Sequence, residues 1–252
     1  MLQLTSATSY LHSQYILHRD LKTSNILLNN RGEVKLADFG MARFTSVPPP
    51  PNLTQLVVTL WYRAPELLLG TRAYSFEVDM WSLGCIFAEL LTLEPLFQGK
   101  NEVDELSLIF ALLGTPTNES WSGFRSLPNA KALHPVLSKA NSVSSLTAGK
   151  FPYLSTSGLR LLSSLLSLNP SNRPTADEVL GHKYFSEDPR PKPKEMFPTF
   201  PSKAGQEKRR RKATPRAPAR GEAPKIDESD VADIFAGREK EEQGAGFNLR
   251  MV

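Results

Sequence analysis

The spacing of apolar residues predicts helices along much of the chain. In residues 1–13, Leu4, Ala7 and Leu11 recur at intervals of three and four, which gives a helix with one apolar face. Residues 78–91 are apolar on almost every side, as expected of a helix in the middle of a core. Further helices are expected at residues 103–113, 157–168 and 175–181.

Two short apolar segments predict a β-hairpin. Residues 26–28 and 34–36 have the composition of strands, and Asn29-Asn30-Arg31-Gly32 between them favours a tight turn. The long segment 38–66 contains several prolines and is expected to be irregular. Residues 122–150 are rich in Ser, Pro and Asn and are expected to form loops with short helical pieces.

The periodic pattern ends after about Asp188, where Pro, Lys, Arg and Glu dominate. We therefore expect one folded domain over residues 1–188 and a largely disordered tail over residues 189–252. Within the tail, Lys208-Arg209-Arg210-Arg211-Lys212 has the composition of a nuclear localisation signal, with a solvated charge run as the alternative. No aromatic residues are interleaved, which argues against direct nucleic-acid binding. The expected location is nuclear.

Cysteine content and hydropathy exclude several classes of protein. The single cysteine, Cys85, cannot form a disulfide framework within the chain and is expected in the core. No run of about 18 apolar residues is present, so no membrane span or membrane partner is expected. The first residues lack the basic start and long apolar stretch of a signal peptide. These features fit a reducing compartment.

Three short motifs follow one another in an order that suits phosphoryl transfer. They are His18-Arg19-Asp20-Leu21-Lys22-Thr23-Ser24-Asn25, Asp38-Phe39-Gly40 and Ala64-Pro65-Glu66. Each alone has an ordinary alternative, because a lone Asp in a loop is most often a turn or cap residue. Together and in this order they resemble the protein kinase signature. In that chemistry, oxygen ligands hold Mg²⁺ while a carboxylate orients the attacking hydroxyl.

The kinase resemblance implies a role for each polar residue of the first two motifs. Asp20 would accept the proton of the substrate hydroxyl, and Lys22 would reach the transferred phosphate of ATP. Asn25 and Asp38 would bind the Mg²⁺ ions, and Leu27 would form the apolar floor beneath the adenine. A Lys at position 22 resembles serine/threonine kinases and not tyrosine kinases.

Longer segments are similar to the cyclin-dependent kinase group. They are residues 57–66, residues 78–86 and Leu113-Gly114-Thr115-Pro116. Residues 196–201 (Met-Phe-Pro-Thr-Phe-Pro) and 246–249 (Gly-Phe-Asn-Leu) further resemble PITSLRE-type cyclin-dependent kinases. The resemblance implies an α+β fold, namely the mainly helical C-lobe of a protein kinase with a short β-hairpin.

The same resemblance implies cofactors and partners. ATP and Mg²⁺ would be the cofactors, and the substrates would be proteins. A cyclin, suspected to be of the L type, would bind the full-length form, and kinases of this kind act in transcription and splicing. Thr54 would be the activating phosphothreonine, with Arg19 and Arg43 as its cationic partners. Both arginines could instead be solvated surface residues.

Further roles follow from the cyclin-dependent kinase resemblance for the segment before residue 66. Val57, Val58 and Arg63 would form the site that prefers proline after the phosphoacceptor. Thr59 would hydrogen-bond the aspartate and the lysine of the catalytic loop.

The remaining roles that this resemblance implies are structural. Glu66 would form a buried ion pair with Arg173, and Asp79 would hold the backbone of the catalytic loop. Trp61 and Trp81 are expected in the core.

No kinase-type Gly-rich loop and no Val-Ala-Ile-Lys strand precede residue 18, so the N-lobe is expected to be absent from this chain. The chain alone would then have no useful kinase activity. Two hypotheses compete. The chain is either a piece of an active, proline-directed serine/threonine kinase or a non-catalytic interaction module that competes for substrates or regulators. The complete set of Asp20, Asn25 and Asp38 favours the first.

Overall fold

The computed structural model describes residues 1–50, 53, 58–130, 146, 149–197 and 199 of the 252-residue chain. All of them belong to one compact unit, Met1–Ser202, and a second unit spans Lys203–Val252. The basic segment that suggests nuclear import lies outside the described residues, as does most of the predicted tail.

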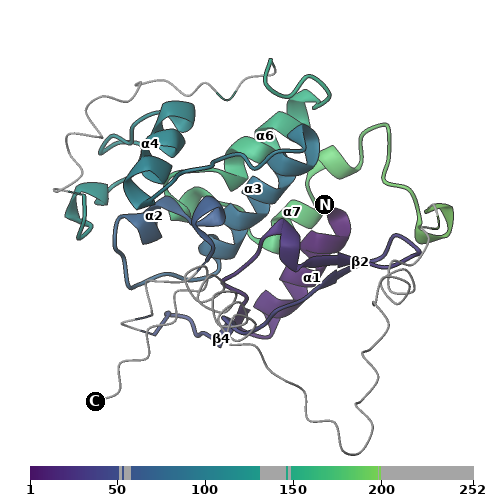
Figure 1. The fold of residues 1–252 in the computed structure, drawn as a ribbon, viewed down its shortest axis with the longest axis horizontal. Helices are drawn as coiled ribbons and strands as arrows, with labels where there is room; N and C mark the ends of the chain where they lie inside the picture. The colour runs from purple at the N-terminus through teal and green to yellow at the C-terminus, as the bar shows by residue number, and fades with distance from the viewer. Residues whose placement is uncertain (51–52, 54–57, 131–145, 147–148, 198, 200–252) are drawn as a thin grey trace, which may run out of the picture. The chain divides into compact units, whose positions relative to one another are not determined.

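The described part of the chain is mainly helical (Figure 1). Its α-helices are α1 (Leu2–Ser13), α2 (Pro65–Leu68), α3 (Glu77–Thr92), α4 (Glu102–Leu113), α6 (Thr156–Leu165) and α7 (Ala176–Leu180). Short 3₁₀ helices lie at Thr23–Asn25, Leu60–Tyr62, Phe124–Ser126, Pro170–Asn172, Lys183–Phe185 and Lys194–Met196. Among the described residues, no helix combines the length and the apolar character needed to cross a membrane.

The predicted hairpin is confirmed. Strands β2 (Ile26–Leu28) and β3 (Val34–Leu36) pair antiparallel, with Ile26 opposite Leu36. The turn between them closes with a hydrogen bond from the amide of Gly32 to the carbonyl of Asn29, 3.1 Å long. Gly32 has φ +76°, a left-handed conformation that glycine adopts without steric cost. A second pair, β1 (Ile16–Leu17) with β4 (Arg43–Phe44), was not predicted, because two residues show no alternation.

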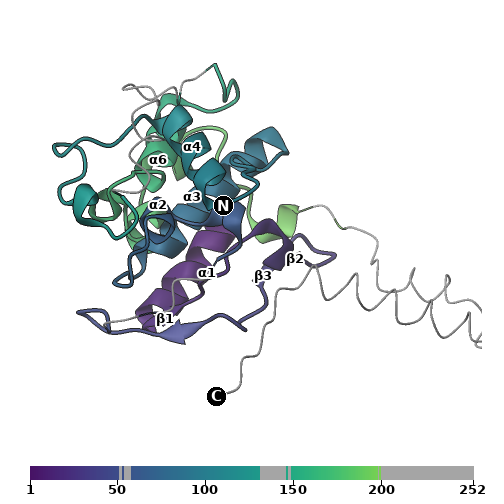
Figure 2. The ribbon, with the colours of Figure 1, turned by 60° about the vertical axis from the view of Figure 1, so that its left-hand side comes forward.

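Helix α3 forms the centre of the core, as its apolar sequence predicts. Trp81, Leu83 and Cys85 are buried in it. A methyl group at Gly84 would lie 2.9 Å from Leu166 Cδ2, so glycine allows the end of α6 to approach α3 closely. Figure 1 and Figure 2 show α1 with the short strands on one side of α3, and α4 and α6 on the other.

Polar caps fix where the other helices begin. Asn101 accepts a hydrogen bond from the amide of Asp104 at the start of α4, and Ser155 accepts one from Gly158 at the start of α6. Helix α7 begins with a capping box between Thr175 and Glu178. Helix α6 ends at Leu165, three residues before the expected end. Leu166 already leaves helical geometry, with φ −92° and ψ 23°, so the helix stops before the Asn169-Pro170 step, which would itself end it.

The expectation that Trp61 is a core residue is wrong. Its side chain is 38% exposed, and its indole N–H donates to the carbonyl of Gly99 at 3.0 Å. The indole N–H needs a hydrogen-bond partner, and it finds one at the edge of the core, where one face of the ring remains open to water.

Candidate functional site

A buried carboxylate on α3 holds the loop between β1 and β2. Asp79 accepts hydrogen bonds from the backbone amides of His18 and Arg19, each 2.9 Å long, and lies 3.0 Å from His12 Nε2. Burial raises the pKa of Asp79, but the contacts with His12 and the two amides more than offset this, so its pKa is below the ordinary value. Asp79 therefore holds the loop as a carboxylate, as the sequence predicted.

Four polar groups, two from the loop and two from Thr59, surround the carboxylate of Asp20. Thr59 donates to Asp20 Oδ1 from both its amide (3.1 Å) and its hydroxyl (3.0 Å). Lys22 Nζ lies 2.8 Å from Asp20 Oδ2 and donates to Thr59 Oγ1 at 2.9 Å. Asn25 Nδ2 donates to the backbone carbonyl of Asp20 (2.9 Å) and to its Oδ2 (3.1 Å). The sequence motif thus becomes one connected cluster in space.

The surroundings of Asp20 keep it ionised. Partial burial raises its pKa, but the hydrogen bonds from Lys22 and Thr59 lower the pKa by more than burial raises it. The pKa of Asp20 therefore lies below the ordinary value. A carboxylate held in one orientation can accept a hydrogen bond from a hydroxyl. The lysine ammonium beside it can stabilise negative charge that develops nearby.

The end of β3 brings Asp38 to the same region. The amide of Ala37 donates to the carbonyl of Asn25 at 2.9 Å, which joins the strand to the catalytic loop. Asp38 follows with φ +62° and is exposed, and its Oδ1 accepts a hydrogen bond from the amide of Gly40 at 3.3 Å. Both hydrogen bonds from the Asn25 side chain use its nitrogen, which leaves its oxygen for another ligand. An amide oxygen and a carboxylate are hard donors that suit Mg²⁺.

Exposed apolar side chains border this polar cluster. Leu27 on β2 is 55% exposed, and Leu28 beside it is also exposed. Phe39 is exposed and packs with its ring centroid 5.0 Å from that of His18. Leu27 thus offers an exposed apolar side chain for a flat ring, the role expected of it, whereas Leu28 points to the opposite face of the strand.

An unusual backbone conformation occurs at Val58. This buried residue has φ +67°, and its carbonyl accepts two hydrogen bonds from Arg63, from Nε at 3.2 Å and from Nη2 at 3.0 Å. A valine in the left-handed region is strained, so the surrounding contacts must hold it there. Val57, the third residue expected at this site, lies outside the described residues.

The predicted ion pair between Glu66 and Arg173 is present and buried. Arg173 Nη1 and Nη2 donate to Glu66 Oε1 and Oε2 at 2.6 Å and 2.7 Å, a bidentate arrangement. The guanidinium also lies 5.0 Å from the centroid of Trp81. The pair joins α2 to the segment after α6, behind the catalytic loop.

The arginines expected beside a phosphothreonine differ in environment. Arg19 is buried and donates to the carbonyl of Met41 (2.7 Å) and to the hydroxyl of Tyr74 (3.0 Å), so the alternative of a solvated surface residue is wrong for it. Arg43 is exposed on β4. Thr54 itself lies outside the described residues.

A second polar cluster, which was not predicted, lies beside the loop. Glu89 near the end of α3 accepts hydrogen bonds from the hydroxyls of Thr23 (2.9 Å) and Tyr62 (2.7 Å). Burial, together with the negative charge of Glu89, raises the pKa of Tyr62 to about 12. No local pattern links Glu89 with Thr23 or Tyr62, so this cluster could not be found from the sequence.

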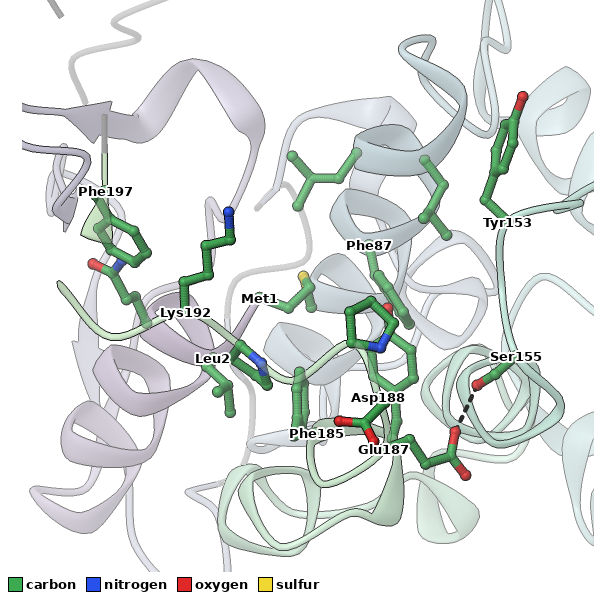
Figure 3. Close-up of a pocket in the computed structure, with 16 residues that line it drawn as sticks. Met1, Leu2, Phe87, Tyr153, Ser155, Phe185, Glu187, Asp188, Lys192 and Phe197 are labelled. Atoms are coloured by element: carbon green, nitrogen blue, oxygen red, sulfur yellow. Dashed lines mark hydrogen bonds between the residues drawn. The ribbon is translucent and has the colours of Figure 1, made fainter. Parts of the chain in front are cut away.

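A cavity of about 510 Å³ lies away from these residues (Figure 3). Its lining includes Met1, Phe87, Tyr153, Phe185 and Phe197 and none of the predicted catalytic residues. In Figure 3, Ser155 and Glu187 meet at its rim through a hydrogen bond of 2.9 Å. The catalytic cluster is therefore distinct from this cavity.

Comparison with known proteins agrees with the geometry. The protein kinase domain family matches residues 1–185. The serine/threonine-protein kinase ppk23 of Schizosaccharomyces pombe is 55% identical over 205 residues, which are 81% of this chain and 50% of that protein. Cyclin-dependent kinase 11B of Mus musculus is 45% identical over 231 residues, 88% of this chain and 28% of that protein. The chain thus spans half or less of the length of these curated relatives.

A solved structure extends the similarity to three dimensions. The crystal structure of the yeast RNA Pol II CTD kinase CTDK-1 complex contains a chain with a TM-score of 0.71 and 41% identity. The match covers 76% of this chain and 62% of that one. At this identity, the likeness extends to sequence as well as to backbone.

Proposed function

Because the chain belongs to the protein kinase domain family, we propose that it carries the phosphoryl-transfer site of an ATP- and Mg²⁺-dependent serine/threonine kinase of the cyclin-dependent group. The observation that carries this proposal is the cluster around Asp20, in which Lys22, Asn25 and Thr59 all contact one carboxylate. Phosphoryl transfer depends on positioning and on charge stabilisation, and this cluster supplies both.

Each residue of the cluster has a defined task in this reaction. Asp20 orients the substrate hydroxyl and takes its proton as the bond to phosphorus forms. Since its pKa is held low, Asp20 is a weak base, and its main contribution is orientation. Lys22 supplies positive charge beside the transferred phosphoryl group. Asn25 and Asp38 are the residues that would hold Mg²⁺, which neutralises phosphate charge when bound.

The geometry at Val58 supports a preference for proline after the phosphoacceptor. The side chain of Arg63 donates two hydrogen bonds to the carbonyl of Val58, so this carbonyl is not available to accept one from the backbone of a bound peptide. A peptide N–H opposite this segment would remain without an acceptor, which costs free energy, whereas proline has no N–H. We infer a Ser-Pro or Thr-Pro substrate, with Val57 as a further wall of the site.

Regulation and location are inferred from the relatives. Phosphorylation of Thr54 would create an anion for Arg19 and Arg43 to bind. The mouse relative is named a cyclin-dependent kinase, so we propose that this protein also binds a cyclin, with an L-type cyclin as the first choice. The basic segment Lys208–Lys212 would direct the protein to the nucleus.

The alternative function is a non-catalytic interaction module. The observation that favours it is the exposure of the apolar side chains of Leu27 and Phe39, which would suit a protein partner.

Transfer of radiolabelled phosphate to a Ser-Pro peptide tests the proposal. The longest natural form, isolated with its bound partner, should be active, and the same form with Asp20→Asn should not. Equal transfer by the two forms would overturn the assignment of Asp20. Turnover by the 252-residue chain above its own Asp20→Asn control would refute the expected inactivity of the chain alone.

A further inference from the structure

The first turn of α4 reaches the segment that faces the substrate. Glu102 Oε1 lies 2.5 Å from Arg63 Nη1. The opposite edge of the same guanidinium, Nε and Nη2, donates to the carbonyl of Val58. A carboxylate, a guanidinium and a carbonyl therefore form one continuous chain from the helix to the left-handed residue.

We propose that Glu102 is a positioning residue that sets how strictly the enzyme requires proline after the phosphoacceptor. This inference rests on the proposed function, in which Arg63 keeps the Val58 carbonyl away from the substrate. Glu102 contacts neither the substrate nor the reacting atoms, and it acts through Arg63.

The shape of the guanidinium group explains the effect. It is planar and rigid, so a contact that fixes Nη1 also fixes the direction of Nε and Nη2. The Arg63 side chain is 12% exposed and that of Glu102 is 49% exposed. Such a partly exposed ion pair adds little to stability, but it restricts the rotamers of Arg63. Without Glu102, Arg63 can turn toward water, and the Val58 carbonyl becomes available to a peptide N–H.

The other acidic residues in this turn have different contacts. Asp104 accepts a hydrogen bond from the amide of Lys100 at 2.9 Å, and buried Glu105 accepts one from the amide of Gly99 at 2.6 Å. Within the described part of the chain, Glu102 is the residue that forms an ion pair with Arg63. Glu105 also acts electrostatically on Arg63, but Glu102 is the acid that directly contacts its guanidinium.

The test compares two peptides that differ only in Pro or Ala after the phosphoacceptor. The longest natural form with its bound partner is assayed as wild type, Glu102→Gln, Arg63→Gln and Glu119→Gln. Glu119 is an exposed acid outside this chain of contacts, so its variant controls for the change in charge. We expect Glu102→Gln to lower the Pro-to-Ala ratio of kcat/KM about three- to tenfold, the size of one weakened charge-assisted hydrogen bond.

The possible results distinguish a wrong role for Glu102 from a wrong proposed function. Arg63→Gln should lower the ratio at least as much as Glu102→Gln, and Glu119→Gln should keep it. If wild type prefers proline but Glu102→Gln keeps the full ratio, or slows both peptides equally, the role of Glu102 is wrong and the proposed function stands. If wild type itself shows no preference for proline, the proline preference and the role of Glu102 both fail.

A measurement on the 252-residue chain avoids any need for activity. Nitrogen-15 NMR of arginine side chains can follow hydrogen exchange at Arg63 Nε–H. We expect Glu102→Gln to speed this exchange and Glu119→Gln to leave it unchanged. Equal protection in wild type and Glu102→Gln would show that Glu102 does not hold Arg63, and this result would overturn the inference.

Discussion

Arg173 and Glu66 meet through two parallel hydrogen bonds, although 107 positions separate them in the sequence. Arg173 Nη1 also donates to the carbonyl of Glu77 at the start of α3. One guanidinium thus ties together α2, α3 and the segment after α6. The pair is buried, so either partner left alone would be a charge without compensation.

Arg173→Ala should destabilise the fold by about 3–5 kcal/mol, the usual effect of breaking a buried ion pair from one side. Urea unfolding of the 252-residue chain measures this free energy. Arg160→Ala serves as the control, because Arg160 is exposed on α6. A loss no larger than that of the control would mean that the pair is not structural.

Thr59→Ala should lower kcat about tenfold, because it removes the hydroxyl that orients Asp20 and contacts Lys22. Thr59→Ser keeps the hydroxyl and should retain most of the rate. Steady-state kinetics of the longest natural form with its partner provides the measurement. Equal rates for the Ala and Ser variants would contradict the role assigned to this hydroxyl.

Asp79→Asn should destabilise the fold at neutral pH, and the difference from wild type should vanish in acid. The pKa of Asp79 is lowered in the folded state, so its contribution is present above the ordinary value of 3.8 and is lost as pH falls through the lower folded value. Unfolding free energies measured from pH 7 downward check this. A difference that stays constant over the whole range would rule out the ionised carboxylate as its cause.

Glu105 should produce the opposite pH dependence. Burial raises its pKa to about 7 from 4.5, and its Oε1 has no hydrogen-bond partner among the described residues. The folded state then retains a proton that the unfolded state has lost. Stability should therefore fall as pH rises from about 4.5 to about 7. Glu105→Gln should flatten this part of the profile, and an unchanged slope would assign the effect to another group.

Much of the fold could be predicted from local pattern. The hairpin has the predicted strand bounds, because a clear turn sequence separates its two strands. Helix α3 extends only one residue beyond the predicted range at each end, because its apolar pattern is long. The pairing of β1 with β4 and the four-residue α2 were missed, since such short elements depend on distant contacts. Trp61 was misplaced because composition alone cannot show which aromatic ring lies at the edge of a core.

The candidate site shows the same division. The contacts of Asp20 with Thr59, of Asp79 with the loop and of Glu66 with Arg173 could be expected only because the cyclin-dependent kinase resemblance implies them. The contacts of Glu89 with Thr23 and of Glu102 with Arg63 join residues 66 and 39 positions apart, and no local pattern links them. Such pairs become visible only when the chain is folded.

The bond between Asp79 and the backbone of the catalytic loop has a consequence for thermal motion. Its carboxylate belongs to α3, the long helix at the centre of the core, and it holds the amides of His18 and Arg19 directly. Surface loops ordinarily open at little cost, independently of the core. We expect the amide hydrogens of His18 and Arg19 to exchange with solvent only when local unfolding also disturbs α3. Heat should therefore abolish the alignment of Asp20 in the same cooperative step that melts the helical core.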